Sequence, residues 1–216
     1  MWKKKGLTAP ALLEKPYVDP SYLPVYELAN RYGWVVLFHT GSVLRGSVDQ
    51  PENVASHRMR AFHLEEVARR FPKLTVVGAH CGNPEYEWAA EVVRWNPDVF
   101  FDLGGSTLTK LSVRLEEFKQ FFLWSGQGEW KAATKPNDES AFIKLVFGSD
   151  SGIDGIERVV SQYHALFKSC NVPVSTQQIS WVGPWQACFV ANDSDFALFA
   201  GDMSPGIGAL LYARAL

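Results

Sequence analysis

Three side chains of metal-binding or acid–base type, His39, His80 and Asp150, stand at or just after short apolar runs of this 216-residue sequence. Imidazole nitrogens and carboxylate oxygens are ligands for Zn²⁺, Mn²⁺ and related divalent cations. A cation held in this way lowers the pKa of bound water and polarises a carbonyl, while a histidine that is not a ligand can move protons. These residue types therefore predict metal-assisted hydrolysis or a related acid–base reaction.

The apolar runs before these residues are predicted to be strands of a parallel sheet in an α/β fold. They alternate with longer amphipathic stretches, which is typical of βα units. The predicted strands cover residues 34–38, 74–79, 99–103 and 143–147, and the predicted helices cover 21–32, 56–71, 84–95 and 156–170. Because parallel sheets place ligand sites at the carboxyl ends of their strands, we expect the three side chains to meet at one rim. The third strand ends in Gly104-Gly105-Ser106, where missing side chains leave room for a bound molecule.

Each of these residues also has an ordinary structural interpretation. A lone histidine at a strand end is more often a hydrogen-bonded packing residue, and Asp150 in the turn 148–152 could cap a helix or form an Asx turn. The coincidence of three strand ends is what favours the functional interpretation. Three further histidines, His57, His63 and His164, are predicted to have structural or surface roles: His57 lies near a helix start, and the other two lack neighbouring ligand types. Cys81 is predicted to be a packing residue, because side chains alternate at a strand end and it would not point to the same side as His80.

Composition narrows the class of protein. The 21 basic and 23 acidic residues give a net charge of −2, so there is no electrostatic signature of nucleic-acid or anionic-membrane binding. No apolar run approaches the ~18 residues that a membrane span requires, and the first residues do not resemble a signal peptide. The three cysteines are scattered, which indicates reduced thiols rather than disulfides. We expect a cytoplasmic protein that acts on a small molecule, with no nucleic-acid or membrane partner.

Four motifs carry a family resemblance: VVLFHTG at 35–41, FPKLTVVGAHCGNP at 71–84, VFFDLGG at 99–105 and LVFGSD at 145–150. In order and spacing they resemble the C-terminal half of the amidohydrolase-related family, in the TIM-barrel branch that includes aminocarboxymuconate-semialdehyde decarboxylase and lactone hydrolases. The resemblance covers residues 19–156. It implies that His39 is a metal ligand after the fifth barrel strand, and that His80, after the sixth, is a proton shuttle or water activator. Asp150, after the eighth, would bind the metal or help to activate its water.

The sequence departs from this family pattern at one point, because the family begins with a His-x-His pair and none occurs here. We therefore expect one domain over residues 1–216 that forms a partial barrel, with strands corresponding to the fifth to eighth. His39 and Asp150 alone would be an incomplete ligand set for zinc. Four strands also leave open edges, which the apolar tail around residues 181–199, a second copy of the chain or another partner would cover.

The resemblance implies a metal-dependent hydrolase that uses metal-activated water on a small carboxylate, lactone or amide, with zinc, or else manganese, as the cofactor. Two alternatives remain open at this point: a metal-dependent decarboxylase, and an inactive or truncated half-barrel that serves as a binding module. A further alternative, a nucleophile elbow at 148–152 with Asp150 as nucleophile, requires a later histidine. Only His164 is available, and it lies inside a predicted helix.

Overall fold

The computed structural model describes residues 15–42, 56–123, 141–174 and 177. Within these ranges four parallel strands form one sheet in the order β1-β2-β3-β4. The strands are β1 (Val35–His39), β2 (Thr75–Ala79), β3 (Val99–Asp102) and β4 (Leu145–Val146). The α-helices are α2 (Leu23–Tyr32), α3 (Phe62–Arg70), α4 (Tyr86–Trp95), α5 (Ser106–Val113), α6 (Leu115–Phe122) and α7 (Ile156–Ser169). Short 3₁₀ turns are η2 (Pro20–Tyr22), η4 (Ser56–Met59), η5 (His80–Gly82), η6 (Ala141–Lys144) and η7 (Ile153–Gly155).

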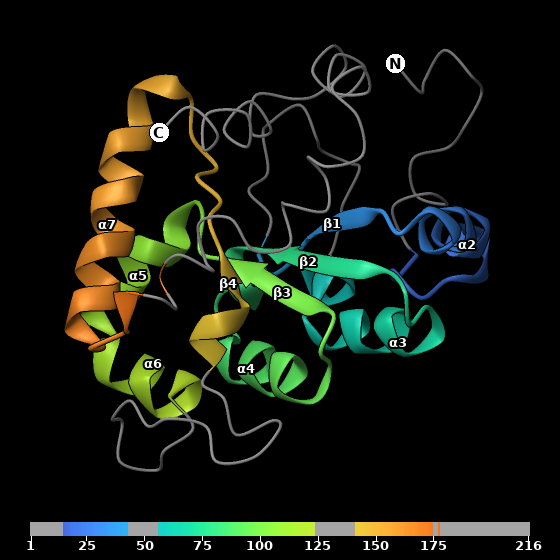
Figure 1. The fold of residues 1–216 in the computed structure, drawn as a ribbon, viewed down its shortest axis with the longest axis horizontal. Coiled ribbons are helices and arrows are strands. Elements are labelled where there is room, and N and C mark those ends of the chain that lie inside the picture. Colours follow the sequence, from blue (N-terminus) through green and yellow to red (C-terminus); the bar gives the residue numbers. More distant parts are fainter. Residues whose placement is uncertain (1–14, 43–55, 124–140, 175–176, 178–216) are drawn as a thin grey trace.

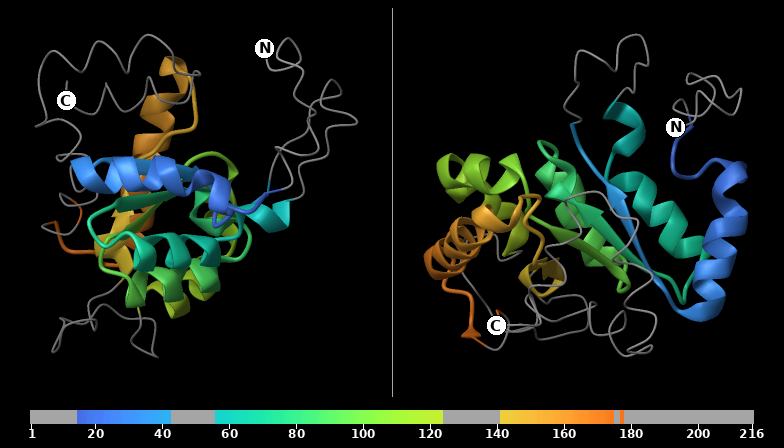
Figure 2. Two further views of the ribbon diagram at one scale, coloured as in Figure 1. Left: turned by 90° about the vertical axis from the view of Figure 1, so that its right-hand side faces the viewer. Right: turned by 90° about the horizontal axis from the view of Figure 1, so that it is seen from above.

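The helices cover one face of the sheet and its two ends. In Figure 1, α3 and α4 lie against the same face, α2 lies at the β1 end, and α5, α6 and α7 gather at the β4 end. The two rotated views in Figure 2 show the same layers. Each strand is followed by a helical segment before the next parallel strand, which is the repeating βα unit that the sequence predicts.

Different sets of apolar side chains pack on the two faces of the sheet. Phe38, Val76 and Phe101 belong to the main core beneath the helices, whereas Val77 and Val146 form a second apolar cluster. Successive residues of a strand point to opposite faces, so these two clusters mark the two sides of the sheet. In the expected partial barrel, this second side would be the inner face of the wall, and it is called the inner side below. His39 shares the odd-numbered phase of Val35, which packs on the inner cluster, and so belongs to the inner side.

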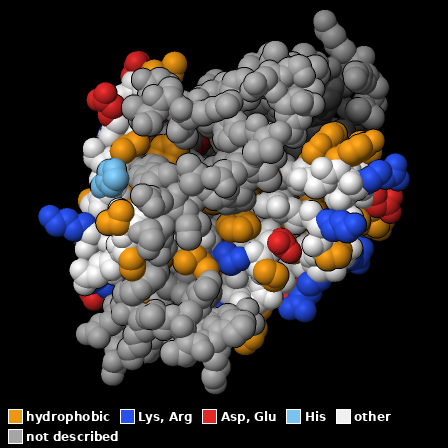
Figure 3. All heavy atoms as spheres, viewed as in Figure 1, with side chains coloured by type: hydrophobic (Ala, Val, Ile, Leu, Met, Phe, Trp, Pro, Cys, Tyr) orange, Lys and Arg blue, Asp and Glu red, His pale blue; other side chains and the backbone are white. Residues whose placement is uncertain are grey.

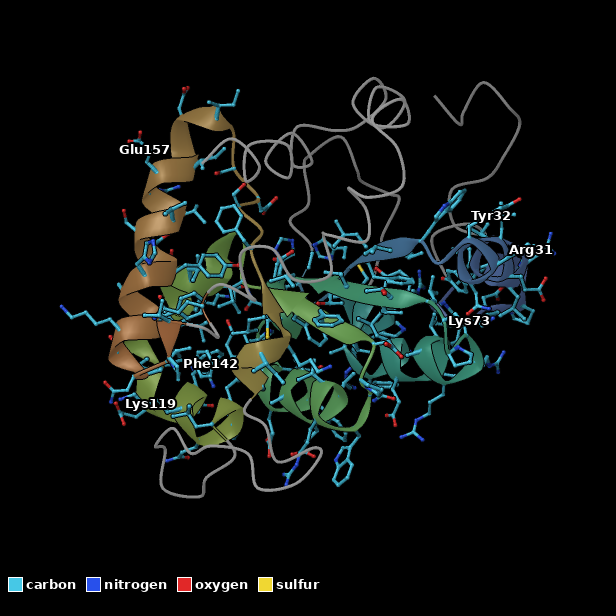
Figure 4. The ribbon with its side chains drawn as sticks, in the orientation of Figure 1. Arg31, Tyr32, Lys73, Lys119, Phe142 and Glu157 are labelled. Atoms are coloured by element: carbon cyan, nitrogen blue, oxygen red, sulfur yellow. The ribbon has the colours of Figure 1, made fainter. Side chains whose placement is uncertain are left out.

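Aromatic side chains close the core at the β4 end. The rings of Phe118 and Phe122 on α6 stack with centroids 4.1 Å apart, and Phe142 of η6, labelled in Figure 4, packs edge-on against Phe118. All three are almost completely buried. At the opposite end, Tyr32, the last residue of α2, and Trp34, which lies between α2 and β1, remain exposed. Figure 3 shows hydrophobic side chains on this part of the surface.

The predicted fold class, α/β with a parallel sheet, is confirmed, and several elements begin or end within two residues of their predicted positions. The predicted helix 21–32 ends at Tyr32, as expected, and is followed by Gly33, whose φ of 63° is left-handed. The predicted helix 56–71 is wrong as one element, since η4 and α3 are separate. The Met59 carbonyl accepts a hydrogen bond from the Gly41 amide at 2.8 Å and is not part of a continuous helical ladder.

Two other predictions need correction. The strand predicted at 143–147 is reduced to Leu145–Val146, because the preceding residues turn as η6 and bury Ala141 and Phe142. Helices α5 and α6 were not predicted from the sequence, although α6 buries Phe118 and Phe122 at helical spacing. The apolar tail around residues 181–199 lies outside the described residues. In the part of the chain that the structure describes, no helix has the length and apolar character required to cross a membrane.

Candidate active site

His39 is the last residue of β1, on the inner side of the sheet. Its backbone carbonyl accepts a hydrogen bond from the Tyr17 hydroxyl. Its Nδ1 is buried and, among the described residues, has no hydrogen-bond partner. Burial lowers the pKa of His39, and the neighbouring His80 lowers it further, while Asp150 opposes both effects. A neutral imidazole with an unpaired nitrogen is the form that binds a metal cation.

His80 follows β2 directly, in a left-handed conformation with a φ of 66°. Its backbone amide donates to Oδ1 of Asp102 at 3.0 Å, and its carbonyl accepts from the Thr107 hydroxyl at 3.0 Å. In the ring, Nδ1 lies 3.2 Å from the carbonyl oxygen of Gly104. Because a carbonyl oxygen can only accept, Nδ1 carries the proton and Nε2 keeps its lone pair when the ring is neutral.

Asp150 follows β4 and also has a left-handed backbone, with a φ of 46°. Its Oδ2 lies 4.0 Å from Nε2 of His80, and its side chain is 55% exposed. At this length there is no direct hydrogen bond. Asp150 can therefore still accept a proton or coordinate a cation, since neither role is blocked by a strong bond to the ring.

The glycines after β3 make room for these side chains. A Cβ at Gly105 would lie 2.7 Å from Oδ2 of Asp150 and 3.3 Å from Nδ1 of His80. Sequence reasoning assigned this space to a bound molecule. The structure corrects that interpretation at Gly105, because residues of the site itself occupy the space.

The structure thus brings together the three residues selected from the sequence. The rings of His39 and His80 lie edge to face with centroids 4.8 Å apart, and His80 in turn approaches Asp150. The described residues contain no group of three or more His, Cys, Asp or Glu side chains placed to hold a metal ion. In chemical terms, the cluster offers an imidazole whose pKa is lowered, an exposed carboxylate and a second imidazole whose Nδ1 is hydrogen-bonded to a carbonyl.

Sequence reasoning missed Asp102, which is buried at the end of β3. Its Oδ1 accepts from the His80 amide and, at 2.8 Å, from the Gly104 amide. Burial raises the pKa of Asp102, and the hydrogen bond from the His80 amide partly offsets this rise. The available signal was its position, because Asp102 lies one residue before the end of the predicted strand 99–103.

The loops after β1 and β2 are joined by further contacts. The Thr40 hydroxyl donates to the carbonyl of Ala79 and accepts from the Gly82 amide at 2.9 Å. A Cβ at Gly41, whose φ is 90°, would lie 2.3 Å from the backbone oxygen of Asn83. This close backbone approach requires glycine and holds the end of β1 against the turn that carries His80.

The remaining residues of ligand type lie elsewhere in the structure. Cys81 is fully buried in the main core, as expected for a packing residue. His57 and His164 are exposed, and His63 is half-buried on α3. These positions agree with the structural or surface roles predicted for them.

Comparisons with known proteins agree with this fold. No curated protein matches the chain. Among solved structures, an uncharacterised TIM-barrel protein, Bb4693 from Bordetella bronchiseptica, is similar with a TM-score of 0.51 and 14% sequence identity. The match covers 81% of this chain and 52% of that one, so the chain spans about half the length of the barrel protein. This likeness identifies the four-stranded sheet as part of a TIM-barrel fold. The model of one family, described as amidohydrolase, matches residues 9–196, and the chain therefore belongs to the amidohydrolase family.

Proposed function

We propose that this chain carries one wall of a metal-dependent hydrolase site, in which His39 and Asp150 are metal ligands and His80 moves protons. The observation that carries the proposal is the convergence of the three side chains at the carboxyl ends of β1, β2 and β4. Membership of the amidohydrolase family supports it. Parallel barrels place their reactive groups at this edge of the sheet.

The donor atoms present fit a divalent cation in part. His39 offers a buried nitrogen without a partner among the described residues, and its lowered pKa favours the neutral ring. Asp150 offers an exposed carboxylate. Because zinc takes three or four protein ligands, the remaining positions would be filled by groups outside the described residues. A cation bound there, zinc or manganese, would lower the pKa of a coordinated water and polarise a substrate carbonyl.

His80 is the proton carrier of this proposal. The Gly104 carbonyl holds the proton on Nδ1, so the bare Nε2 faces the side on which Asp150 lies. From there Nε2 can take a proton from a water molecule and return it to a leaving group. We assign His39 to metal binding rather than to proton transfer, because its buried Nδ1 has no partner among the described residues and burial lowers its pKa.

The substrate class is a small carboxylate, lactone or amide, by resemblance to the branch of the family described above. In this proposal β1 to β4 correspond to the fifth to eighth strands of the family barrel. The same site would also suit a decarboxylation, and analysis of the reaction products distinguishes decarboxylation from hydrolysis. Release of CO₂ without hydrolysis would assign the decarboxylase reaction, and metal binding without any turnover would assign a binding module.

The test combines binding with assay. Dialysed protein is titrated calorimetrically with Zn²⁺ and with Mn²⁺, and metal-loaded protein is assayed on lactones, amides and small carboxylates. We expect stoichiometric binding in the wild type and at least about tenfold weaker binding in His39→Ala and Asp150→Asn. His57→Ala, which alters an exposed histidine, is the matched control. Equal affinity in wild type, His39→Ala and Asp150→Asn would exclude these ligands.

A further inference from the structure

We propose that Asp102 is a positioning residue that fixes both the backbone and the ring tautomer of His80. This inference refines the role of His80 and so rests on the proposed function. The tautomer of the His80 ring, however, can be measured whether or not the chain is active. Asp102 lies within the motif VFFDLGG, but the resemblance assigned it no role. Its hydrogen bonds are to backbone amides and not to the imidazole rings of His39 and His80.

The first contact is with the backbone of His80. A residue other than glycine rarely adopts a positive φ, and here His80 and Cys81 do so in succession, at 66° and 51°. The His80 amide donates to Oδ1 of Asp102 at 3.0 Å. A carboxylate is a strong acceptor for a backbone N–H, so this bond stabilises a turn that the local sequence disfavours.

The second contact reaches the ring through Gly104. The same Oδ1 accepts from the Gly104 amide at 2.8 Å, and the Gly104 carbonyl lies 3.2 Å from Nδ1 of His80. One carboxylate oxygen therefore holds the backbone of His80 and also the residue whose carbonyl binds its ring. The bond from Nδ1–H to that carbonyl leaves Nε2 as the bare nitrogen.

The side chain of Asp102 is closely packed by its neighbours. A Cβ at Gly148 would lie 2.6 Å from Cγ of Asp102, so glycine is required opposite it. The Tyr163 hydroxyl accepts from the amides of Leu103, at 2.8 Å, and Gly148, at 3.3 Å. Tyr163 thus links Leu103, the residue after Asp102, to Gly148, the residue that packs against Asp102. Asp102 is itself only 6% exposed, so its contacts are shielded from water.

The experiment reads the ring directly. Protein labelled with ¹⁵N-histidine is studied by long-range ¹H–¹⁵N correlation, with His80→Gln used to assign the signals. In the wild type at a pH where the ring is neutral, we expect a protonated Nδ1 and a bare Nε2. In Asp102→Asn, whose amide oxygen can still accept both N–H groups, we expect the same tautomer. In Asp102→Ala we expect loss of the Nδ1–H form in favour of Nε2–H or a mixture, with at least about tenfold faster exchange of the His80 and Gly104 amides.

Thr107→Val is the matched control, because the Thr107 hydroxyl donates a hydrogen bond to the His80 carbonyl and not to the Gly104 carbonyl that binds the ring. It should leave the tautomer unchanged. A folded Asp102→Ala variant with the wild-type tautomer and wild-type amide exchange overturns the proposal. If that variant does not fold, the proposal is tested by the His80 tautomer and the amide exchange of the wild type and Asp102→Asn. An Nε2–H ring in the wild type, or free exchange of the two amides, then contradicts it.

These readouts separate the inference from the proposed function, since none requires a metal or a substrate. A protein with the expected tautomer but no metal binding would refute the metal site and retain Asp102 as the residue that orients His80. A protein that binds metal but has the opposite His80 tautomer would support the metal site and refute the role of Asp102.

Discussion

The imidazole rings of His39 and His80 lie edge to face, with centroids 4.8 Å apart and an interplanar angle of 65°. The register of the sheet explains this contact, because His39 pairs with Ala79, the residue immediately before His80. The two histidines differ in their hydrogen bonds. Nδ1 of His39 is buried without a partner among the described residues, whereas Nδ1 of His80 is bound to a carbonyl. Different bonding of two adjacent rings is the basis for assigning them different roles.

This difference predicts that the two histidines separate binding from turnover. His80→Asn should keep metal affinity within about threefold of the wild type, yet lower kcat by about 10²–10⁴-fold, the usual contribution of a general acid or base. Calorimetry and steady-state kinetics on the metal-loaded chain measure the two quantities. His164→Asn, at an exposed position of α7, should change neither. Loss of metal binding in His80→Asn would instead make His80 a ligand.

Gly148→Ala should lower the free energy of unfolding by about 1–3 kcal/mol, the usual cost of inserting a methyl group into a filled space. The added Cβ would lie 2.6–2.7 Å from three atoms of Asp102, so carboxylate or backbone must shift. Gly152→Ala, four residues away in the same turn region, meets nothing within 4 Å and is the control. Urea unfolding of both variants provides the comparison. Equal stability of the two would show that Asp102 is free to move.

Tyr163→Phe should also be destabilising, by about 1–3 kcal/mol, because it removes only a hydroxyl and leaves the buried amide of Leu103 without an acceptor. The matched control is Tyr32→Phe, at a side chain that is 61% exposed, for which we expect a change within about 0.5 kcal/mol. Thermal and urea unfolding measure both. A neutral effect of Tyr163→Phe would mean that another group accepts from Leu103.

Cys170 should react slowly with iodoacetamide from pH 7 to 9 in the native protein. Burial raises the pKa of its thiol from 9.0 to about 12, so little thiolate forms in this range. Cys81, which is fully buried, should also be protected. Labelling followed peptide by peptide with mass spectrometry should show both residues reacting rapidly only in urea. Fast native labelling of Cys170 would contradict its burial.

The same shift predicts the sign of a stability change at alkaline pH. Above pH 9 the unfolded chain loses the Cys170 proton while the folded chain retains it, so the unfolded state is favoured. The contribution of Cys170 to stability is therefore present below about pH 9 and declines as pH rises towards 12. Urea unfolding at pH 8 and pH 10, with Cys170→Ala for comparison, should show a smaller decline in the variant.

Local sequence determined the alternation of strands and helices and the residues that end the strands. The apolar runs before His39 and His80 form β1 and β2 because β-branched and other apolar residues favour strands, and in β2 they are buried on both faces, as is typical of a parallel sheet. The parallel order then requires their carboxyl ends to meet, so proximity of His39, His80 and Asp150 could be expected before any coordinates. Helix α5 has only a weak local period, and its burial depends on contacts with α7. Helix α6 does have a helical period, with Phe118 and Phe122 on its buried face, and sequence reasoning overlooked it.

Only the tertiary structure decided how the site is held. Asp102 and Tyr163 act on backbone amides 22 and 60 residues distant along the chain, and no local pattern records such pairings. The tautomer of His80 likewise depends on a carbonyl 24 residues away. The glycines at 105 and 148 are explained by side chains that arrive from other strands. Residue type and strand order thus determine which groups meet. Hydrogen bonds between distant segments determine their orientation, because the direction of a donor or acceptor is set by the backbone that surrounds it.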